Sequence, residues 1–508
     1  MTRRGQDGNA SARKIEAFIS HFSAGVKLNA AGHRELAEAE FRKALTFNPK
    51  DAIALTNLGV VVYEQGRVEE SIKLHRKAVA LDPKAGIAHN NLGVSLNAMY
   101  RYPEAVAAYA RAVDLDPTNA QTLSNYGDAL TNSGRYADSV PQLLKALSIR
   151  PDYAEAYSNL GMAYWGLGQL DDAIAALRKA LDLNPALAMA RKNLGSVLLM
   201  CGQFTEGWQQ YDYRWTADSI LLRYVYPLWT GRPVDGELLI WGEQGPGDEI
   251  LHASMMGDLV AAGMRVVWEC DPRLAPLFQR SYPTVRVIPR RTPQPDLGDN
   301  IKAHLPGGSV GHIVRFDRSR FPLQRRAYLE PDVARAAAFR AKLGLKAGEK
   351  LVGISWLSKN VAFGEKKSTA LAAWVDILRT PGCRFVDLQY GDTLVERQAL
   401  ARQHGVELLH VDGLDMRDDL DGLAALVSAC DLVITVSNTT AHVAGAVGTP
   451  VWILVASGGG KLWYWGTEKD DVPVWYPVAR IIRQRTGDPW AVSLKYAADA
   501  LEALRKHP

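Results

Sequence analysis

The chain has 508 residues, too many for one hydrophobic core, and this length indicates roughly three domains. Apolar residues make up 47% and charged residues 22%, which is typical of a soluble globular protein rather than a disordered one. The formal net charge of +4 is too small to indicate a nucleic-acid-binding surface or a polybasic membrane anchor. No segment has the apolar run of a signal peptide or the ~20 apolar residues of a membrane span. The four cysteines lie far apart without C-x-x-C spacing, so we expect a cytoplasmic protein with neither a zinc site nor a disulfide framework.

After an expected N-terminal tail of residues 1–17, residues 18–221 repeat with a period of 34. Two of the recurring residue types are proline, at Pro49, Pro83, Pro117, Pro151 and Pro185, and glycine, at Gly25, Gly59, Gly93, Gly127, Gly161 and Gly195. The pattern resembles the tetratricopeptide repeat, a helix-turn-helix unit, and about six units fit the segment. Small residues let the two helices approach closely, and the proline ends the second helix. Stacked units form an α superhelix, so we expect a solenoid that binds a protein or peptide.

An asparagine recurs on the first helix of successive units, at Asn57, Asn91, Asn125, Asn159 and Asn193. An asparagine amide can both donate to a carbonyl and accept from an N–H of an extended peptide. The array is similar to the superhelix of nucleocytoplasmic O-linked N-acetylglucosamine transferases, in which an asparagine ladder holds the acceptor chain. This resemblance implies acceptor binding by the five asparagines. The alternative is that asparagine is common at this repeat position and caps or spaces the helices.

An aromatic segment follows the repeats and contains Trp208, Tyr211, Tyr213, Trp215, Tyr224, Tyr226 and Trp229. A flexible linker would instead be rich in glycine and serine. Because aromatic side chains bury large areas, the segment predicts that the last repeat helices pack rigidly against the second half of the chain.

From residue 236 onward, short apolar segments alternate with helical ones, which indicates parallel βαβ units. The predicted strands form one set at 237–241, 265–268 and 285–288 and another at 351–356, 384–388, 431–436 and 451–455. A polar, alanine-rich helix is expected between the sets, at 331–350. Two doubly wound α/β domains, at 222–345 and 346–508, are the simplest interpretation, with ligands at the carboxyl ends of their strands.

The first candidate motif is the glycine turn Gly245-Pro246-Gly247-Asp248, which follows a strand and opens a helix. Glycines let the backbone approach a ligand closely, but the G-x-G-x-x-G spacing of a dinucleotide site is absent. Asp248 is either the N-cap of the helix or a general base directed into the cleft, and both can hold together.

A second motif, Ser437-Asn438-Thr439-Thr440-Ala441-His442, also joins a strand to a helix. The free N–H groups and partial positive charge of a helix N-terminus suit a phosphate. Thr439, Thr440 and His442 would add side-chain donors. The alternative is an ordinary capped helix with a satisfied core histidine.

Two further segments follow predicted strands. Lys366 and Lys367 lie on a loop, where a lysine can neutralise the charge that develops on a leaving phosphate, although such a run is more often solvated surface. Gln389 ends another strand, a natural position for contacts to a base or a ribose.

The motifs at 245–248 and 438–442, with Gly448-Thr449-Pro450, resemble lipopolysaccharide heptosyltransferases, a glycosyltransferase family 9-like group of GT-B fold. The terminal Trp475-Tyr476-Pro477, with Arg480 and Arg483-Gln484, resembles the ending of bacterial chains that fuse tetratricopeptide repeats to that domain. Some such fusions glycosylate flagellin, often with a nonulosonic acid. The resemblance implies two facing Rossmann-like domains, with the acceptor side at 222–345 and the nucleotide-sugar side at 346–508. Ser437-Asn438 stands where heptosyltransferases commonly have Asp-Thr, so an ADP-heptose donor is not expected.

By the same resemblance, Asp248 is the catalytic base, Thr439, Thr440 and His442 hold the donor phosphate, and Lys366 or Lys367 assists. The expected donor-binding residues also include Ser437, Asn438, Gln389, Gly245 and Gly247. The expected activity is metal-independent transfer of a sugar from a nucleotide-sugar co-substrate to a serine or threonine of a protein such as flagellin, without a further cofactor. One alternative is a transferase acting on a lipid-linked or oligosaccharide acceptor. The other is a non-catalytic repeat adaptor whose transferase domain has degenerated.

Overall fold

The computed structural model describes residues 3–217, 224–321, 327–360, 364–458, 462–470 and 472–506. The chain divides into two compact units, Met1–Leu187 and Ala188–Pro508. The predicted domain boundary at 221 and 222 lies outside the described residues. The structure instead places its main division inside the repeat region, before the sixth predicted repeat.

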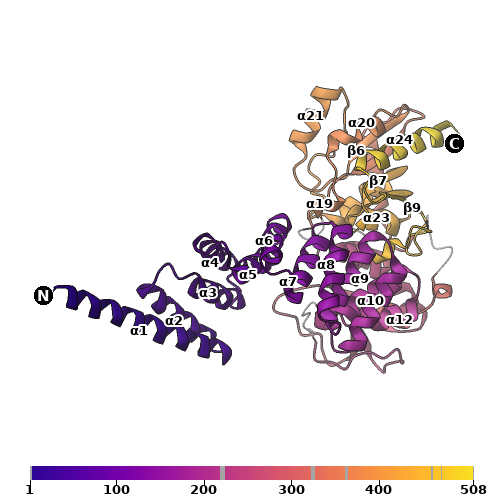
Figure 1. The fold of residues 1–508 in the computed structure, drawn as a ribbon. Coiled ribbons are helices and arrows are strands. Elements are labelled where there is room, and N and C mark those ends of the chain that lie inside the picture. The colour runs from indigo at the N-terminus through magenta and orange to yellow at the C-terminus, as the bar shows by residue number, and fades with distance from the viewer. Residues whose placement is uncertain are drawn as a thin grey trace. The chain divides into compact units, whose positions relative to one another are not determined.

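The first unit consists of ten helices in antiparallel pairs (Figure 1). They are α1 (Arg3–Ala30), α2 (Arg34–Phe47), α3 (Ala52–Glu64), α4 (Val68–Leu81), α5 (Gly86–Ala98), α6 (Tyr102–Leu115), α7 (Ala120–Asn132), α8 (Tyr136–Ile149), α9 (Ala154–Leu167) and α10 (Leu170–Leu183). Each second helix ends two residues before a proline of the repeat, as the sequence predicts. Helix α1 begins at Arg3, so residues 3–17, expected as a tail, continue the first repeat helix toward the N-terminus.

The repeated glycine lies where the two helices of a unit cross most closely. A Cβ atom added to Gly59 would lie 2.5 Å from the ring of His75 on the facing helix. The same contact recurs between Gly25 and Phe41, Gly93 and Tyr109, Gly127 and Leu143, and Gly161 and Leu177. At each crossing, the missing side chain of the glycine makes room for a bulky side chain of the facing helix. This explains why glycine recurs at the same position of every unit.

His75 gives this unit a predicted sensitivity to acid. Its ring is buried, burial lowers its pKa to about 4, and its Nδ1 has no hydrogen-bond partner among the described residues. The unfolded state therefore binds a proton near pH 6.5 that the folded state does not bind. Stability is complete above that pH and falls as the pH drops toward 4, by about 2 kcal/mol at roughly pH 5.

We expect His75→Phe, which copies the contact of Phe41 with Gly25, to remove this loss. Urea unfolding of the two proteins at neutral pH and at roughly pH 5 measures it. The free energy of unfolding of the variant, minus that of wild type, should be larger at the acidic pH than at neutral pH. An equal difference at both pH values would contradict the prediction that His75 is unprotonated in the folded state.

The second unit opens with α11 (Ala188–Met200), α12 (Phe204–Tyr211) and α13 (Arg214–Ala217). The buried indole of Trp208 donates a hydrogen bond from Nε1 to the Arg315 carbonyl oxygen at 3.0 Å. Its ring also meets Trp463 and Trp475 edge-on, with centroid distances of 5.4 and 6.3 Å. A Cβ on Gly311 would lie 2.2 Å from that ring. The predicted aromatic docking of the last repeat helices is therefore confirmed, and it explains why these helices belong to the second unit.

Two parallel sheets form the rest of this unit. The first has the order β3-β2-β1-β4, with β1 (Glu237–Trp241), β2 (Arg265–Cys270), β3 (Arg286–Pro289) and β4 (Ile301–Pro306). Its connections contain α14 (Pro246–Ala253), α15 (Met256–Ala261), α16 (Ala275–Ser281), the short η1 (Gly307–Ser309), α17 (Val310–Val314) and η2 (Arg318–Arg320). The second has the order β6-β5-β7-β8-β9, with β5 (Lys350–Ser355), β6 (Cys383–Asp387), β7 (Leu432–Val436), β8 (Val451–Val455) and β9 (Ala479–Arg483).

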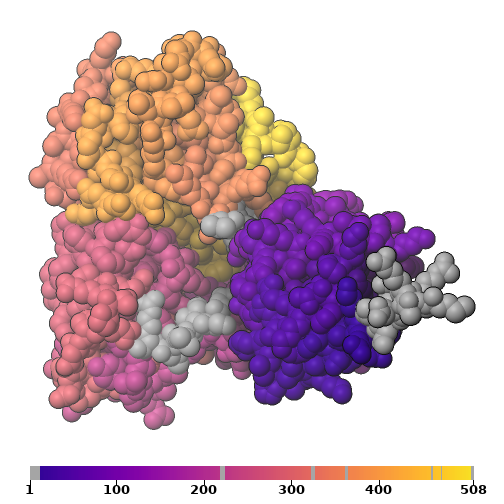
Figure 2. Space-filling view, turned by 90° about the vertical axis from the view of Figure 1, so that its left-hand side faces the viewer, coloured from indigo at the N-terminus to yellow at the C-terminus, as the bar shows by residue number. Residues whose placement is uncertain are grey.

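The helices of the second sheet are α18 (Val333–Lys342), α19 (Gly364–Lys367), η3 (Leu371–Trp374), α20 (Val375–Leu378), α21 (Leu394–His404), α22 (Leu420–Ser428), α23 (Thr439–Val447), η5 (Trp463–Trp465) and α24 (Trp490–Lys506). The C-terminal α24 lies beside α20 and β9 (Figure 1). In the space-filling view, the half with the first sheet (pink) lies directly against the half with the second sheet (orange) (Figure 2). No helix among the described residues is long and apolar enough to span a bilayer.

Three elements differ from the sequence prediction. Strands β4 and β9 were not predicted, because β4 alternates with Lys302 and ends in proline, while arginines interrupt the short apolar run of β9. Both lie at the edge of a sheet, where such residues are tolerated. The helix expected at 331–350 is shorter: it ends at Lys342, and Gly344, directly after the C-cap Leu343, has a positive φ of 62° that stops it.

The strand orders fix where ligands are expected. In a doubly wound sheet, ligands bind at the carboxyl ends of the strands where the strand order reverses. In the first sheet this point lies between β1 and β4, and in the second it lies between β5 and β7. The glycine turn at 245–248 follows β1, and the motif at 437–442 follows β7, so each candidate motif lies beside one of these points.

Candidate functional site

The two motifs meet in the folded unit. Helix α14, which follows the glycine turn after β1, packs against α23, which follows β7. A Cβ atom on Gly247 would lie 3.0 Å from Cδ2 of His442, so a larger residue here would press against the histidine ring. We call the glycine turn, Lys367 and the first turn of α23 the α14–α23 site.

Asp248 is the half-buried carboxylate of this site. It is not the N-cap of α14: Gly245 occupies that position, and Pro246 begins the helix, as proline favours at a first helical residue. The Gly245 N–H donates to Asp248 Oδ2 at 3.3 Å, which orients the carboxylate. Burial raises the pKa of Asp248 to about 6, although the Gly245 N–H and the charge of Lys367 both lower it. Nearby Glu243 raises it further.

Lys367, on the short α19, is buried with only 5% of its surface exposed. Burial lowers its pKa to about 8, against the opposing charge of Asp248. Lys366 is half-buried, and burial also lowers its pKa. A solvated surface run, the commoner interpretation of two adjacent lysines, is therefore wrong for Lys367. This side chain is the cation whose charge acts on Asp248.

The side chain of Asn438 is engaged in the fold. Its Oδ1 caps α23 by accepting from the Thr440 N–H at 3.0 Å, and its Nδ2 donates to Ser355 Oγ at 2.7 Å. The same Nδ2 donates to the Leu357 carbonyl oxygen at 3.1 Å. The N-cap is thus an asparagine amide rather than a hydroxyl, and it joins β5 to α23 at the reversal point of the second sheet.

Ser437 and Gln389 have comparable roles. Ser437 Oγ accepts from Trp465 Nε1 at 2.7 Å. Gln389 Oε1 accepts from Ser355 Oγ and from the N–H groups of Trp356 and Leu357, at 2.9 to 3.0 Å. Gln389 thus shapes the loop after β5, whereas Ser437 holds the indole of Trp465 on η5.

The structure shows His442 as a buried histidine that is hydrogen-bonded within the core, which is the alternative that the sequence offered to a phosphate ligand. Its buried ring shares a hydrogen bond of 2.7 Å between Nδ1 and the Tyr476 hydroxyl, and it packs against the rings of Tyr464 and Trp465. Burial lowers its pKa to about 3, with smaller contributions from Lys367 and His252. The ring is therefore neutral near pH 7 and contributes no positive charge. The N–H groups of Thr440 and Ala441 already donate to Asn438, and the Thr440 side chain is buried. Half-buried Thr439 is therefore the residue of this turn that remains to meet an anion.

Sequence reasoning missed the ion pair behind Asp248. Arg214 is fully buried and binds Glu243 in a bidentate manner, with Nη2–Oε1 at 2.6 Å and Nε–Oε2 at 3.1 Å. Glu243 Oε1 also accepts from the Gly308 N–H at 2.9 Å, which joins the ends of β1 and β4. Burial alone would raise the pKa of Glu243, but Arg214 holds it below its usual value. A glutamate between β1 and the glycine turn was the available sequence signal.

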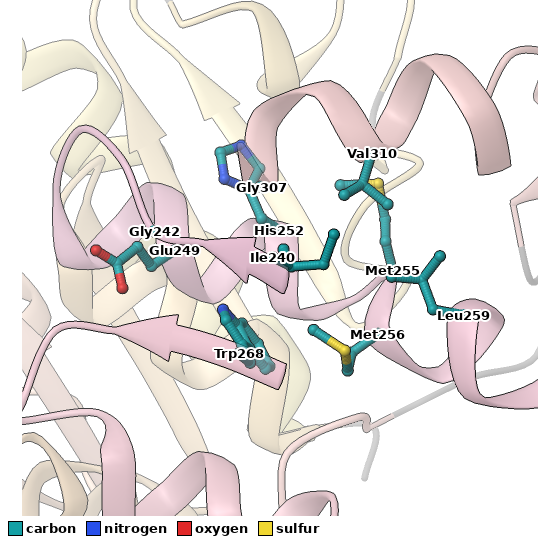
Figure 3. Close-up of a pocket in the computed structure, with 10 residues that line it drawn as sticks. All are labelled: Ile240, Gly242, Glu249, His252, Met255, Met256, Leu259, Trp268, Gly307 and Val310. Atoms are coloured by element: carbon teal, nitrogen blue, oxygen red, sulfur yellow. The ribbon is translucent and has the colours of Figure 1, made fainter. Parts of the chain in front are cut away.

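A small cavity lies behind β1 (Figure 3). Its walls are mainly apolar, including Met255, Met256 and Trp268, while the His252 ring is directed toward Gly307 (Figure 3). Its volume of about 10 Å³ corresponds to no more than a single water molecule. This cavity therefore does not serve as a substrate pocket.

The five ladder asparagines are half-exposed on the first helices of their units, and none of them caps a helix. Asn125 Nδ2 donates to Asn90 Oδ1, and Asn159 Nδ2 donates to Ser124 Oγ, both at 3.2 Å. Asn57 Nδ2 donates to the Ile53 carbonyl oxygen of its own helix at 2.9 Å. Asn125 and Asn159 thus connect neighbouring units while remaining partly accessible, which supports a spacing role for these two, and none of the five has the capping role.

Within the described ranges, no group of three or more histidine, cysteine, aspartate or glutamate residues is arranged to hold a metal ion. The four cysteines are free thiols.

Models of the tetratricopeptide repeat match residues 28–86, 72–120, 118–186 and 158–216. The chain therefore contains tetratricopeptide repeats, and they precede a region of two parallel sheets. It is 34% identical over 325 residues to Protein FlbA of Caulobacter vibrioides, a match that covers 60% of this chain and 53% of FlbA. The chain thus spans about half the length of this curated relative.

Among solved structures, the chain is similar to YrrB, described as a tetratricopeptide-repeat protein with an unusual peptide-binding site, at 24% identity and a TM-score of 0.32. That match covers 36% of this chain and 94% of YrrB. TTC0263 from Thermus thermophilus matches at 26% identity and a TM-score of 0.31, over 36% of this chain and 99% of its own. MamA matches at 26% identity and a TM-score of 0.31, over 34% of this chain and 93% of its own.

Proposed function

We propose that the chain is a glycosyltransferase of GT-B type that moves a sugar from a nucleotide-sugar to a serine or threonine of a protein bound by the repeats. The α14–α23 site carries this proposal: a carboxylate with a raised pKa, a buried lysine and a helix N-terminus converge where two parallel sheets meet. Such convergence of titratable groups with shifted pKa values is typical of catalytic sites.

In the proposed reaction, Asp248 accepts the proton of the acceptor hydroxyl as its oxygen attacks the anomeric carbon of the sugar. The bond between that carbon and the phosphate oxygen breaks, and its electron pair leaves with the nucleotide. The N-terminus of α23 and the Lys367 ammonium stabilise the developing negative charge on the phosphate. Because these groups neutralise the charge, we expect no metal requirement.

The two shifted pKa values predict the pH dependence of transfer. The rate should rise as the pH increases through about 6, because Asp248 must lose its proton to act as a base. It should fall as the pH increases through about 8, because Lys367 then loses the charge that meets the phosphate. A profile of kcat/KM against pH measures both limbs, and Lys367→Arg should remove the alkaline limb. An alkaline limb that persists in this variant would exclude Lys367 as its source.

Incubation with a panel of nucleotide-sugars tests the activity itself, with free nucleotide and the intact mass of a co-incubated acceptor as readouts. The resemblance to bacterial fusions that modify flagellin makes flagellin the first acceptor and nucleotide-activated nonulosonic acids the first donors to examine. Nucleotide release coupled to a mass increase of the acceptor supports the proposal. A flagellin of unchanged mass together with a modified glycan or lipid would identify the other acceptor class.

A non-catalytic adaptor is the second candidate. The internal hydrogen bonds of Asn438, Ser437, Gln389 and His442 favour it, because these side chains are satisfied by the protein itself. Release of no nucleotide from any donor, with acceptor binding retained, would establish this function.

A further inference from the structure

One face of the first helices carries a pattern of its own in the first unit. Positions i, i+4 and i+7 share one side of a helix. In three consecutive units they hold Ile53, Asn57 and Val60 on α3, Ile87, Asn91 and Val94 on α5, and Gln121, Asn125 and Asp128 on α7. We call this surface, with Ile19 and Val26 on α1 and Glu155 on α9, the ladder face.

The isoleucines of the ladder face are unusually exposed. Ile19, Ile53 and Ile87 recur at the period of the repeat, with 55%, 65% and 72% of their surfaces accessible. Single exposed apolar residues are ordinary on protein surfaces and need no explanation. A row of β-branched side chains at the same position of three consecutive units instead forms a periodic apolar strip, which on α3 and α5 shares a helix side with the ladder asparagines.

A hollow of about 420 Å³ opens beside this strip, between the start of α5 and the start of α7. Its walls include Ile87, the charged side chains of Lys84 and Asp116, and the amide side chains of Asn90, Asn91, Asn119 and Gln121. The volume lies in the range of sites that hold small ligands or several side chains. An apolar wall surrounded by amides suits an aliphatic side chain together with the polar backbone that carries it.

The ladder face becomes acidic in the next units. Asp128 is half-buried and accepts hydrogen bonds from Asn97 Nδ2 at 3.0 Å and Asn132 Nδ2 at 3.1 Å. No lysine or arginine of the described part of the chain forms an ion pair with it, and burial raises its pKa. Glu155 is exposed at the position that Gln121 holds in the preceding unit and that isoleucine holds in the three units before it. Asp128 therefore has no cationic partner within the described part of the protein, and a lysine or arginine of a bound polypeptide can supply one.

We propose that the ladder face binds an extended polypeptide segment with an aliphatic residue at every third position, followed by a lysine or arginine at the end that reaches Asp128. The first helices of neighbouring units pack together, at an axial separation of about 10 Å. An extended chain in the polyproline II conformation advances about 9 Å in three residues, which matches this separation. The inference rests on the proposed function and names the acceptor chemistry for it.

A random peptide library selected on the full-length protein tests the proposal without requiring catalysis. Wild type should enrich peptides with aliphatic residues three positions apart and a basic residue at one end. Ile53→Ser with Ile87→Ser should lower the affinity for a selected peptide at least about tenfold and remove the aliphatic preference. Asp128→Asn, which keeps an acceptor for Asn97 and Asn132, should remove the basic preference alone.

Leu144→Ser is the matched control, because Leu144 is 47% exposed on α8, outside the ladder face. It should leave the selection unchanged. Enrichment without aliphatic spacing, or the same peptides selected by the isoleucine variant, would overturn the proposal. Binding of the nucleotide alone to the α14–α23 site requires no peptide, so it is measured separately. Failure of the selection with nucleotide binding retained refutes the ladder-face assignment, whereas absence of nucleotide binding refutes the transferase.

Discussion

Replacing Asp248 by asparagine is expected to lower the rate of sugar transfer by a factor of about 10² to 10⁴ while leaving donor affinity nearly unchanged. An amide cannot take the proton from the acceptor hydroxyl, but its oxygen can still accept from the Gly245 N–H and keep the turn in place. Single-turnover transfer rates and equilibrium binding of the nucleotide measure the two effects separately.

Asp376→Asn is the control for this experiment, because Asp376 is an exposed carboxylate on α20 in the same unit. It should keep the wild-type rate. If Asp248→Asn also turned over at the wild-type rate, Asp248 would not be the base. Loss of nucleotide binding in that variant would instead assign Asp248 to the donor site.

The second large effect concerns stability. Arg214→Met is expected to lower the free energy of unfolding of the second unit by about 3–5 kcal/mol, because Glu243 would remain buried without its partner. Arg384→Met is the control: it removes an exposed ion pair with Glu407 and should cost at most about 1 kcal/mol. Urea unfolding measures both.

The double variant Arg214→Met with Glu243→Gln identifies the cause. It should recover part of the lost stability, since the uncompensated charge disappears with the glutamate. Equal losses in Arg214→Met and Arg384→Met would show that the buried pair contributes no more than a surface pair.

The repeats could be predicted because their signal is periodic: the glycine that faces His75 recurs wherever two helices must touch. Strands β1, β5, β7 and β8 were also predictable, since central parallel strands are continuous apolar runs. Edge strands β4 and β9 carry polar residues and proline that a sheet edge tolerates, so their local sequences resemble loops.

For the candidate site, the sequence could indicate which segments meet but not which side chains are free. Both motifs follow strands whose carboxyl ends carry ligand sites in this class of fold, so their convergence follows from the topology. The choice between Lys366 and Lys367 depends on burial, which adjacent sequence positions do not reveal. The engagement of Asn438 depends on Ser355, a residue of another strand, and no local pattern encodes that pair.

A crystal structure of the full chain with the nucleotide released from its donor tests the proposed enzymatic function. We expect the phosphate to contact Thr439 at the start of α23 and Lys367 Nζ, with Asp248 facing the vacated sugar position. A nucleotide bound away from α23, with the α14–α23 site closed by the protein's own side chains, would contradict the proposed enzymatic function.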